Sequence, residues 1–317
     1  MSDTTTNHST DRSAEEPPTA IRAGFQVSHA APVALGEAWG EGWRCDQAVL
    51  IPSDDRARAT WTAQVMDQVR PSGVSVARPL RSTDGRYTLG GWTARGFLSG
   101  HRAPRFDETA ASALRFNEAL AKVDAARRRP AFLDTSAVVA AAGATGSAGG
   151  GGVGELSETA LFAVAEAAAW ADDPTELLAP VMDLAEVPRD DVAAAMEKAT
   201  GVMLLRTEVA AADQLVHGDV LGCTIYDGYA DPAIVDLVPA WRPAGWSVAL
   251  LVVDAIAWAN AEDGLIQRWS HLPDFDQLLL RAVMYRLFVH AVLPDSSPSA
   301  WSGISRVSDV VAARVGV

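Results

Sequence analysis

Two aspartates in residues 215–236 are the side chains best suited to chemistry. The segment reads LVHGDVLGCTIYDGYADPAIVD, so Asp219 follows one apolar run and Asp236 ends another. A turn-rich stretch at 227–232 separates two short strand-like runs, which predicts a hairpin that carries both carboxylates. Phosphoryl transfer uses such a pair, because one carboxylate orients the attacking hydroxyl group and another holds magnesium on the phosphates. Asp219 is therefore the candidate catalytic residue and Asp236 the candidate metal ligand.

The order of these residues resembles the aminoglycoside phosphotransferase family, a branch of the protein-kinase-like fold that carries His-Gly-Asp in its catalytic loop. The resemblance implies an α+β, two-lobed fold with a small antiparallel-sheet N-lobe, one long helix in that lobe, and a larger, mainly helical C-lobe. It implies ATP and Mg²⁺ as possible cofactors. It also implies that His217 supports the loop and that Asp254 braces it from a helix beneath.

Three residues that the resemblance implies are missing at the matching positions. Ile51 or a neighbour in the run AVLI stands where a phosphate-binding lysine is expected, and no lysine occurs in the first 121 residues. Gln64 stands where that lysine's glutamate partner is expected. Cys223 and Thr224 replace an asparagine that completes the metal site, and neither suits magnesium as well. A lone charge in a closed cleft is costly, so the joint loss of lysine and glutamate indicates that their ion pair has no function here.

A glycine-bearing stretch at 33–45 has the place of a nucleotide lid between two strands. Its bulky Trp39 and Trp43 and its acidic Glu37 and Glu41 are unusual beside a triphosphate. Arg44 is either a substitute cation or an exposed strand charge. The run Arg95-Gly96-Phe97-Leu98 has the place of the hinge whose backbone meets an adenine ring. The candidate nucleotide-binding residues are Gly36, Gly40, Gly42, Arg44, Arg95 and Phe97.

The chain changes from strand-like to helical patterns near residue 100. We expect a disordered tail at 1–22, an N-lobe at 23–100 and a C-lobe at 101–317, with a flexible Gly/Ala loop at 138–154 and the hairpin at 215–236. Residues 74–80 and 87–98 are predicted to form a strand hairpin. Helices are predicted at 55–69, 108–126, 155–172, 175–183, 190–211, 246–261, 263–269, 275–291 and 306–314.

Composition narrows the classes of function. The 317 residues have a formal net charge of −14, which argues against nucleic-acid binding because that requires clustered basic residues. The most apolar segment, 248–261, is too short and too interrupted by Asp254 to span a bilayer. Two cysteines, Cys45 and Cys223, give no disulfide framework and agree with a cytoplasmic location.

Two functions remain open, and a third interpretation competes with both. The missing residues favour a pseudokinase that binds a small-molecule ligand or a protein partner, whereas the two retained aspartates favour an active ATP-dependent phosphotransferase acting on a small hydroxyl or amine compound. The runs LVHGD, RPLRSTDGRY and GWTARGF are similar to an actinobacterial branch of phosphotransferase-like proteins with degenerate kinase motifs. The third interpretation is an unrelated α+β binding protein in which Asp219 and Asp236 lie far apart.

Overall fold

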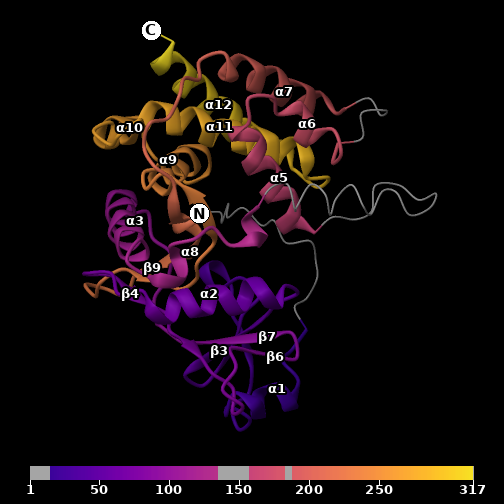
Figure 1. Cartoon of the computed structure of the whole chain (residues 1–317), viewed down its shortest axis with the longest axis vertical. Helices are drawn as coiled ribbons and strands as arrows, with labels where there is room; N and C mark the ends of the chain where they lie inside the picture. Colours follow the sequence, from indigo (N-terminus) through magenta and orange to yellow (C-terminus); the bar gives the residue numbers. More distant parts are fainter. Residues whose placement is uncertain (1–14, 135–156, 183–187, 317) are drawn as a thin grey trace, which may run out of the picture. The chain divides into compact units, whose positions relative to one another are not determined.

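The computed structural model describes residues 15–134, 157–182 and 188–316 (Figure 1). Two compact units divide the chain. Unit 1 comprises Met1–Arg128 with Gln214–Ser247, and unit 2 comprises Arg129–Asp213 with Val248–Val317. These units are defined by how compactly the chain folds, and their boundaries differ from the predicted lobe boundary at residue 100. That lobe boundary stays a prediction. The predicted flexible loop at 138–154 and the first 14 residues of the predicted tail lie outside the described residues.

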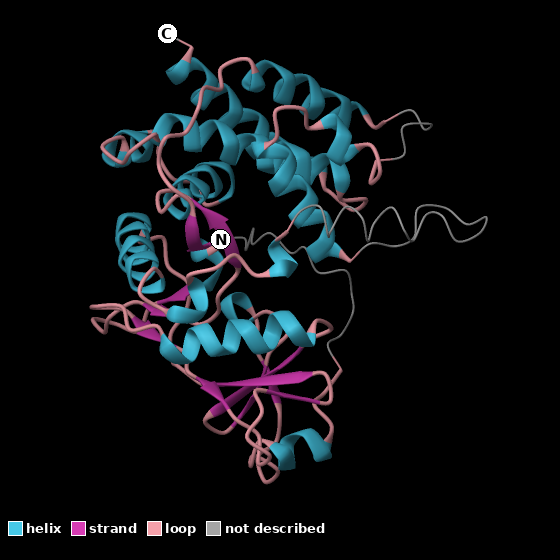
Figure 2. Ribbon diagram, in the orientation of Figure 1, coloured by secondary structure: helices cyan, strands magenta, loops and turns pink. Residues whose placement is uncertain are grey.

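The main sheet of unit 1 is antiparallel, as predicted (Figure 2). Its strands run in the order β1-β2-β3-β7-β5, and β6 also pairs with β7. The β5 pairing with β7 confirms the predicted hairpin. The strands are β1 (Val33–Ala34), β2 (Trp43–Cys45), β3 (Ala48–Pro52), β5 (Pro79–Leu80), β6 (Thr88–Leu89) and β7 (Trp92–Gly96).

Strand register decides which side chains share a face of this sheet. Val49 of β3 lies between Arg44 of β2 and Arg95 of β7, so these three side chains project to the same face. Leu50, one residue along, joins a core on the opposite face. That core includes Ile21 from helix α1 (Thr19–Gly24), so the end of the predicted tail is ordered: Ile21 is buried there, and the expectation of disorder at 19–22 is wrong.

Helix α2 (Arg56–Gln68) matches the predicted helix at 55–69. Asp55 caps its first turn by accepting a hydrogen bond from the backbone N–H of Arg58 at 2.9 Å. Its buried face carries Val65 and Met66, whereas Gln64 is exposed to solvent. Gln64 therefore does not present its side chain to the sheet in the way that the missing glutamate would.

The predicted hairpin at 215–236 forms beside helix α3 (Phe106–Leu120), and a 3₁₀ turn, η2 (Asp124–Ala126), follows that helix. The segment before His-Gly-Asp is a strand, not the end of a helix, because α7 in unit 2 already ends at Met203. β4 pairs with β10 in parallel and so leaves the predicted strand hairpin. The elements are β4 (Ser75–Val76), β8 (Gln214–His217), α8 (Val220–Cys223), β9 (Thr224–Ile225), β10 (Ala233–Ile234) and β11 (Pro239–Arg242).

Unit 2 is helical, as predicted for this part of the chain. Helix α11 packs against α5, α7 and α12 and is buried along most of its length (Figure 1). Its elements are η3 (Ala131–Leu133), α5 (Glu158–Trp170), α6 (Thr175–Leu178), α7 (Asp190–Met203), most of α9 (Trp246–Trp258), α10 (Gly264–Trp269), α11 (Phe275–Val292) and α12 (Pro298–Val315). In the described part of the chain, every helix is too short or too polar to cross a membrane.

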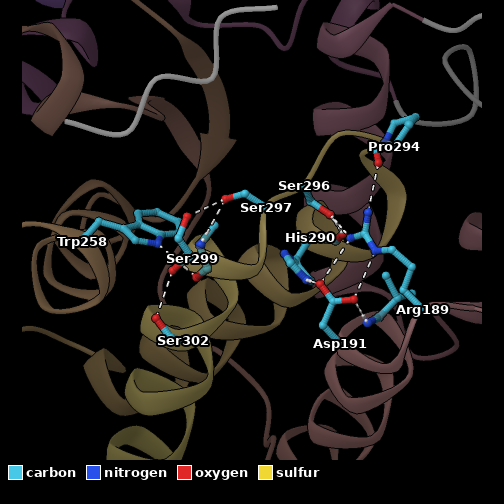
Figure 3. A network of polar contacts seen from close by, with 11 residues as sticks. Arg189, Asp191, Trp258, His290, Pro294, Ser296, Ser297, Ser299 and Ser302 are labelled. Atoms are coloured by element: carbon cyan, nitrogen blue, oxygen red, sulfur yellow. Dashed lines mark hydrogen bonds and ion pairs between the residues drawn. The ribbon is translucent and has the colours of Figure 1, made fainter. Parts of the chain in front are cut away.

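A polar network ties α7 to the end of α11 in unit 2 (Figure 3). The Asp191 carboxylate lies between the Arg189 guanidinium, at 3.1 Å, and the ring Nε2 of buried His290, at 3.0 Å. Arg189 also donates to Ser296 Oγ at 2.6 Å. These contacts join helices that are distant in sequence, so we interpret the network as structural.

Candidate functional site

The backbones of Asp219 and Asp236 both contact the imidazole ring of His217. Nδ1 of His217 accepts a hydrogen bond from the backbone N–H of Asp219 at 3.0 Å, and Nε2 contacts the backbone carbonyl oxygen of Asp236 at 2.9 Å. The β9 and β10 strands between them pair in antiparallel register. The two aspartates are therefore neighbours in space, which excludes the interpretation that they lie far apart.

These contacts fix the protonation state of His217. Because the N–H of Asp219 donates to Nδ1, that nitrogen carries no proton, and Nε2 must carry one in order to donate to the carbonyl oxygen of Asp236. The ring is thus neutral. Burial lowers the pKa of His217, which agrees with this assignment since a buried imidazole resists gaining charge. The sequence predicted a supporting residue here, and the structure places one between the two loops.

Asn117 of α3 holds the same loop, and the sequence analysis missed it. Its Oδ1 accepts from the backbone N–H of His217 at 3.1 Å, and its Nδ2 donates to the Ala244 carbonyl oxygen at 3.0 Å. Nδ2 also donates to Ser247 Oγ, whose hydroxyl donates to the His217 carbonyl oxygen at 2.6 Å. Asn117 is fully buried. A buried amide needs hydrogen-bond partners, so a lone asparagine in an apolar helix pattern was the available signal.

Asp219 uses its carboxylate to cap α8. Oδ1 accepts from the backbone N–H of Gly222 at 2.8 Å, and the side chain is partly exposed. A Cβ at Gly222 would lie 2.8 Å from this oxygen, closer than real Cβ atoms approach, so glycine is required for the cap. The carboxylate is therefore accessible but engaged with its own loop.

The two residues at the missing asparagine offer no replacement ligand. Thr224 is buried and donates its hydroxyl to the Val220 carbonyl oxygen at 2.7 Å. Cys223 is buried as well, and burial raises the pKa of its thiol well above the ordinary value, which keeps it protonated. A thiol in this state is neither a nucleophile nor a ligand for a hard cation.

Asp236 is paired with an arginine. Nη2 of Arg95 lies 2.6 Å from Oδ1 of Asp236, and Nη1 of the same guanidinium donates to the Val235 carbonyl oxygen at 2.8 Å. Oδ1 also accepts from the backbone N–H of Leu237 at 2.6 Å. The side chains of Arg95 and Asp236 are 14% and 34% exposed, so the pair is partly desolvated. Sequence matching gave Arg95 a backbone role at an adenine hinge, whereas the structure uses its side chain on the metal-loop carboxylate.

The Asp236 carboxylate, which is the predicted magnesium ligand, is paired with a cation in this structure. Magnesium takes about six oxygen ligands at roughly 2.1 Å, usually one or two carboxylates together with waters and substrate phosphates, so a free carboxylate oxygen is needed at Asp236. Oδ1 of Asp236 accepts a hydrogen bond from the backbone N–H of Leu237 and forms an ion pair with Arg95, and Oδ1 of Asp219 caps its own helix. Across the described ranges, no three His, Cys, Asp or Glu side chains are grouped as a metal site. We therefore derive no chemical step through a bound metal.

The predicted nucleotide lid, residues 33–45, buries its own tryptophan, Trp39. Trp39, from the 3₁₀ turn η1 (Glu37–Trp39), is 7% exposed and stacks on Phe97 with ring centroids 6.0 Å apart and an interplanar angle of 24°. It belongs to a cluster that contains Val49 of β3 together with Ile225 and Val235 of the hairpin. The lid thus packs directly onto both the sheet and the hairpin.

The lid glycines serve this packing. A Cβ at Gly42 would lie 2.8 Å from Cγ1 of Val49 and 2.9 Å from the Trp39 carbonyl oxygen, so only glycine lets the lid approach β3 this closely. Gly40 has φ +55°, which an L side chain rarely adopts. The Gly36 carbonyl oxygen accepts from the Trp39 N–H at 3.2 Å. All three predicted glycines lie in the lid, where they shape a turn that buries Trp39.

The Arg44 guanidinium lies on the Phe97 ring. Its guanidinium carbon lies 3.8 Å from the centroid of the Phe97 ring, and its Nε donates to the Asp46 carbonyl oxygen at 3.0 Å. This geometry is a cation–π contact with the Phe97 ring, and a phosphate-binding role for Arg44 stays a prediction. Arg44 therefore stabilises the aromatic pair.

Asp254 lies in α9 within unit 2. It accepts from Nε of Arg286 at 2.7 Å, and their side chains are 8% and 13% exposed. A carboxylate this deeply buried requires such a partner. The contacts that hold the His-Gly-Asp loop in unit 1 come from Asn117 and Ser247, and a role for Asp254 in bracing that loop stays a prediction.

Comparison with solved structures identifies the fold. Aminoglycoside phosphotransferase APH(4)-Ia matches with a TM-score of 0.53 at 14% identity, over 94% of this chain and 97% of that chain. A choline/ethanolamine kinase family protein from Mesorhizobium loti matches with a TM-score of 0.52 at 15% identity, over 92% and 95%. The AMP-bound complex of spectinomycin phosphotransferase APH(9)-Ia matches with a TM-score of 0.52 at 7% identity, over 92% and 96%.

Comparisons at the level of sequence add no further relative. No protein-family model and no curated protein matches this chain. Identities of 15% or less establish the fold alone, and the fold agrees with the antiparallel sheet, the long helix and the hairpin described above. The chain has the protein-kinase-like fold of the aminoglycoside phosphotransferases.

Proposed function

We propose that this protein is a pseudokinase that binds a small-molecule ligand or a protein partner and does not transfer phosphate efficiently. The observation that carries the proposal is Trp39, whose buried ring stacks on Phe97 within the lid. By the resemblance, Phe97 belongs to the run that would meet an adenine ring, and its ring is covered by Trp39. Nucleotide binding would require Trp39 to leave its cluster, so we propose that ATP binds weakly or not at all.

The missing polar residues support the same proposal. Losing one preorganised electrostatic contact in an active site costs on the order of 3 kcal/mol, which corresponds to roughly a hundredfold in rate. Ile51 or a neighbour stands at the expected lysine position, and Cys223 and Thr224 stand at the expected asparagine position. Independent losses would multiply to about ten-thousandfold. Residual catalysis by Asp219 would be too slow to serve as the function.

The alternative is an active phosphotransferase that uses Asp219 as base and Asp236 as metal ligand. The fold neighbours are phosphotransferases and kinase-family proteins, and one of them binds AMP, which keeps this alternative testable. It requires Asp236 to exchange Arg95 for magnesium and the lid to open. We favour the pseudokinase because the alternative needs both changes.

The experiment is an ADP-release assay with ATP and Mg²⁺ across a panel of small hydroxyl and amine compounds. Asp219→Asn is the test variant, because asparagine also caps helices and preserves α8. Asp231→Asn, on the exposed turn of the same hairpin, is the matched control. We expect the same background rate in wild type and both variants. Release that falls only in Asp219→Asn would establish the active alternative.

A thermal-shift titration addresses the ligand. We expect ATP with Mg²⁺ to leave the melting temperature unchanged, and a metabolite that binds would raise it in proportion to the logarithm of its concentration above Kd. The two free cysteines are both buried, which agrees with a reducing compartment, and we propose the cytoplasm as the location.

A further inference from the structure

The cation that contacts the hairpin is Arg95, and it comes from strand β7 of the main sheet. The resemblance implies a cation on β3, at Ile51 or a neighbour, and Ile51 packs against the Trp39 cluster. Arg95 lies on the next strand, β7, directly opposite Val49, so its side chain projects from the same face as Ile51. From there it reaches the carboxylate of Asp236.

We propose that the Arg95 guanidinium takes the place of a divalent metal ion at Asp236, so that the hairpin keeps its loop geometry without metal or nucleotide. The inference deepens the proposed function and rests on it. It makes Arg95 a positioning residue that holds Asp236, and it predicts that any ligand of this site binds independently of Mg²⁺ and Mn²⁺.

The contacts of Arg95 explain why it can do this. One guanidinium nitrogen binds Oδ1 of Asp236 at 2.6 Å while the other binds the Val235 carbonyl oxygen at 2.8 Å, so the fork grips both the carboxylate and the backbone before it. Guanidinium does not lose its proton in proteins, so this charge is permanent. A divalent ion at the same oxygen would be repelled by that fixed charge.

The same contacts connect Arg95 to the imidazole that supports both loops. The backbone carbonyl oxygen of Asp236 accepts from His217, and the backbone N–H of Leu237 donates to the Asp236 carboxylate. Arg95 thus fixes the side chain of Asp236 while His217 fixes its backbone. The residue is held at both ends without any ligand.

A double-mutant cycle on the full chain measures this pairing. Urea unfolding is compared for wild type, Arg95→Met, Asp236→Asn and the double variant. We expect Asp236→Asn alone to lower the folding equilibrium constant roughly tenfold to hundredfold, and to lower it at most about threefold when Arg95 is already methionine. Arg44→Met is the matched control, since Arg44 projects from the same face but lies on Phe97; its effect should add to that of Asp236→Asn.

Electron paramagnetic resonance of Mn²⁺ provides a readout that does not depend on stability. We expect wild type and Asp236→Asn to leave the free-Mn²⁺ signal equally unchanged. Additive effects of Arg95→Met and Asp236→Asn would overturn the proposal, as would Mn²⁺ binding by wild type that is lost in Asp236→Asn. Asp219-dependent ADP release that persists in EDTA and in Asp236→Asn would overturn the proposed function and leave the Arg95–Asp236 assignment standing, whereas release that requires Mg²⁺ and Asp236 would overturn both.

Discussion

Removing the Trp39 ring should destabilise unit 1 by an amount that follows from its burial. The side chain is 7% exposed, so nearly all of it leaves water on folding. A buried aromatic side chain removes roughly 150–250 Å² from solvent, worth ~4–6 kcal/mol at about 25 cal/mol per Å². Alanine retains part of this area and the short η1 turn can relax, so we expect Trp39→Ala to cost about 3 kcal/mol, at the low end for such substitutions.

Urea unfolding followed by far-ultraviolet circular dichroism measures this loss. Tyr229→Ala is the matched control, because Tyr229 lies on the hairpin turn and is fully exposed; its unfolding midpoint should equal that of wild type. The truncation also opens space beside Phe97. We therefore expect ADP without metal to raise the melting temperature of Trp39→Ala and to leave that of wild type unchanged.

Two results would refute this reasoning. A loss below about 0.5 kcal/mol in Trp39→Ala would mean that the ring is not part of the core, since surface substitutions stay within that range. Stabilisation of wild type by ADP would mean that the lid accommodates a nucleotide with Trp39 present.

Three further predictions concern polar contacts that lie within unit 1 or within unit 2. Asn117→Ala strands the backbone N–H of His217 and should cost about 2–4 kcal/mol in urea unfolding; an effect below 1 kcal/mol would contradict its bracing role. Because the pKa of His217 is lowered in the folded state, the free energy of unfolding of the wild type should decrease as pH falls below about 6.5, by at most ~1.4 kcal/mol per pH unit. His217→Gln should lose this pH dependence, whereas His271→Gln, at an exposed position, should keep it. Burial raises the pKa of Asp191, but hydrogen bonds from Arg189 and His290 outweigh this effect and lower it. Asp191→Asn should therefore be less stable than wild type at pH 7, and the difference in stability should shrink as pH falls below about 3.9. A difference that grows instead would be inconsistent with the network.

The hairpin and the long helix were predictable because their signals are local. Apolar runs that flank the turn at 227–232 specify β9 and β10, and Asp55 marks the start of α2 three residues before the N–H that it caps. Asp219 and Asp236 follow from the same pattern, since the hairpin brings them to one imidazole. This local pattern, together with its resemblance to the aminoglycoside phosphotransferases, was enough to predict the fold.

The contacts that redefine the site were not predictable, because they join segments distant in sequence. Arg95 and the Val235 carbonyl oxygen are 140 residues apart, and no periodicity in either segment indicates that a strand arginine reaches the metal loop. Trp39 was recognised as bulky, but its burial on Phe97 depends on how the lid folds. Gln64 was placed by motif matching alone, whereas the buried positions Val65 and Met66 turn it outward.

The central claim is that this kinase-like hairpin holds no magnesium-dependent nucleotide, and isothermal titration calorimetry tests it most directly. Wild type is titrated with a non-hydrolysable ATP analogue in the presence and absence of Mg²⁺, with Asp236→Asn alongside. The account predicts no saturable heat up to about 1 mM ligand in either condition, which corresponds to binding weaker than roughly −4 kcal/mol. Saturable binding that requires Mg²⁺ and disappears in Asp236→Asn would contradict it.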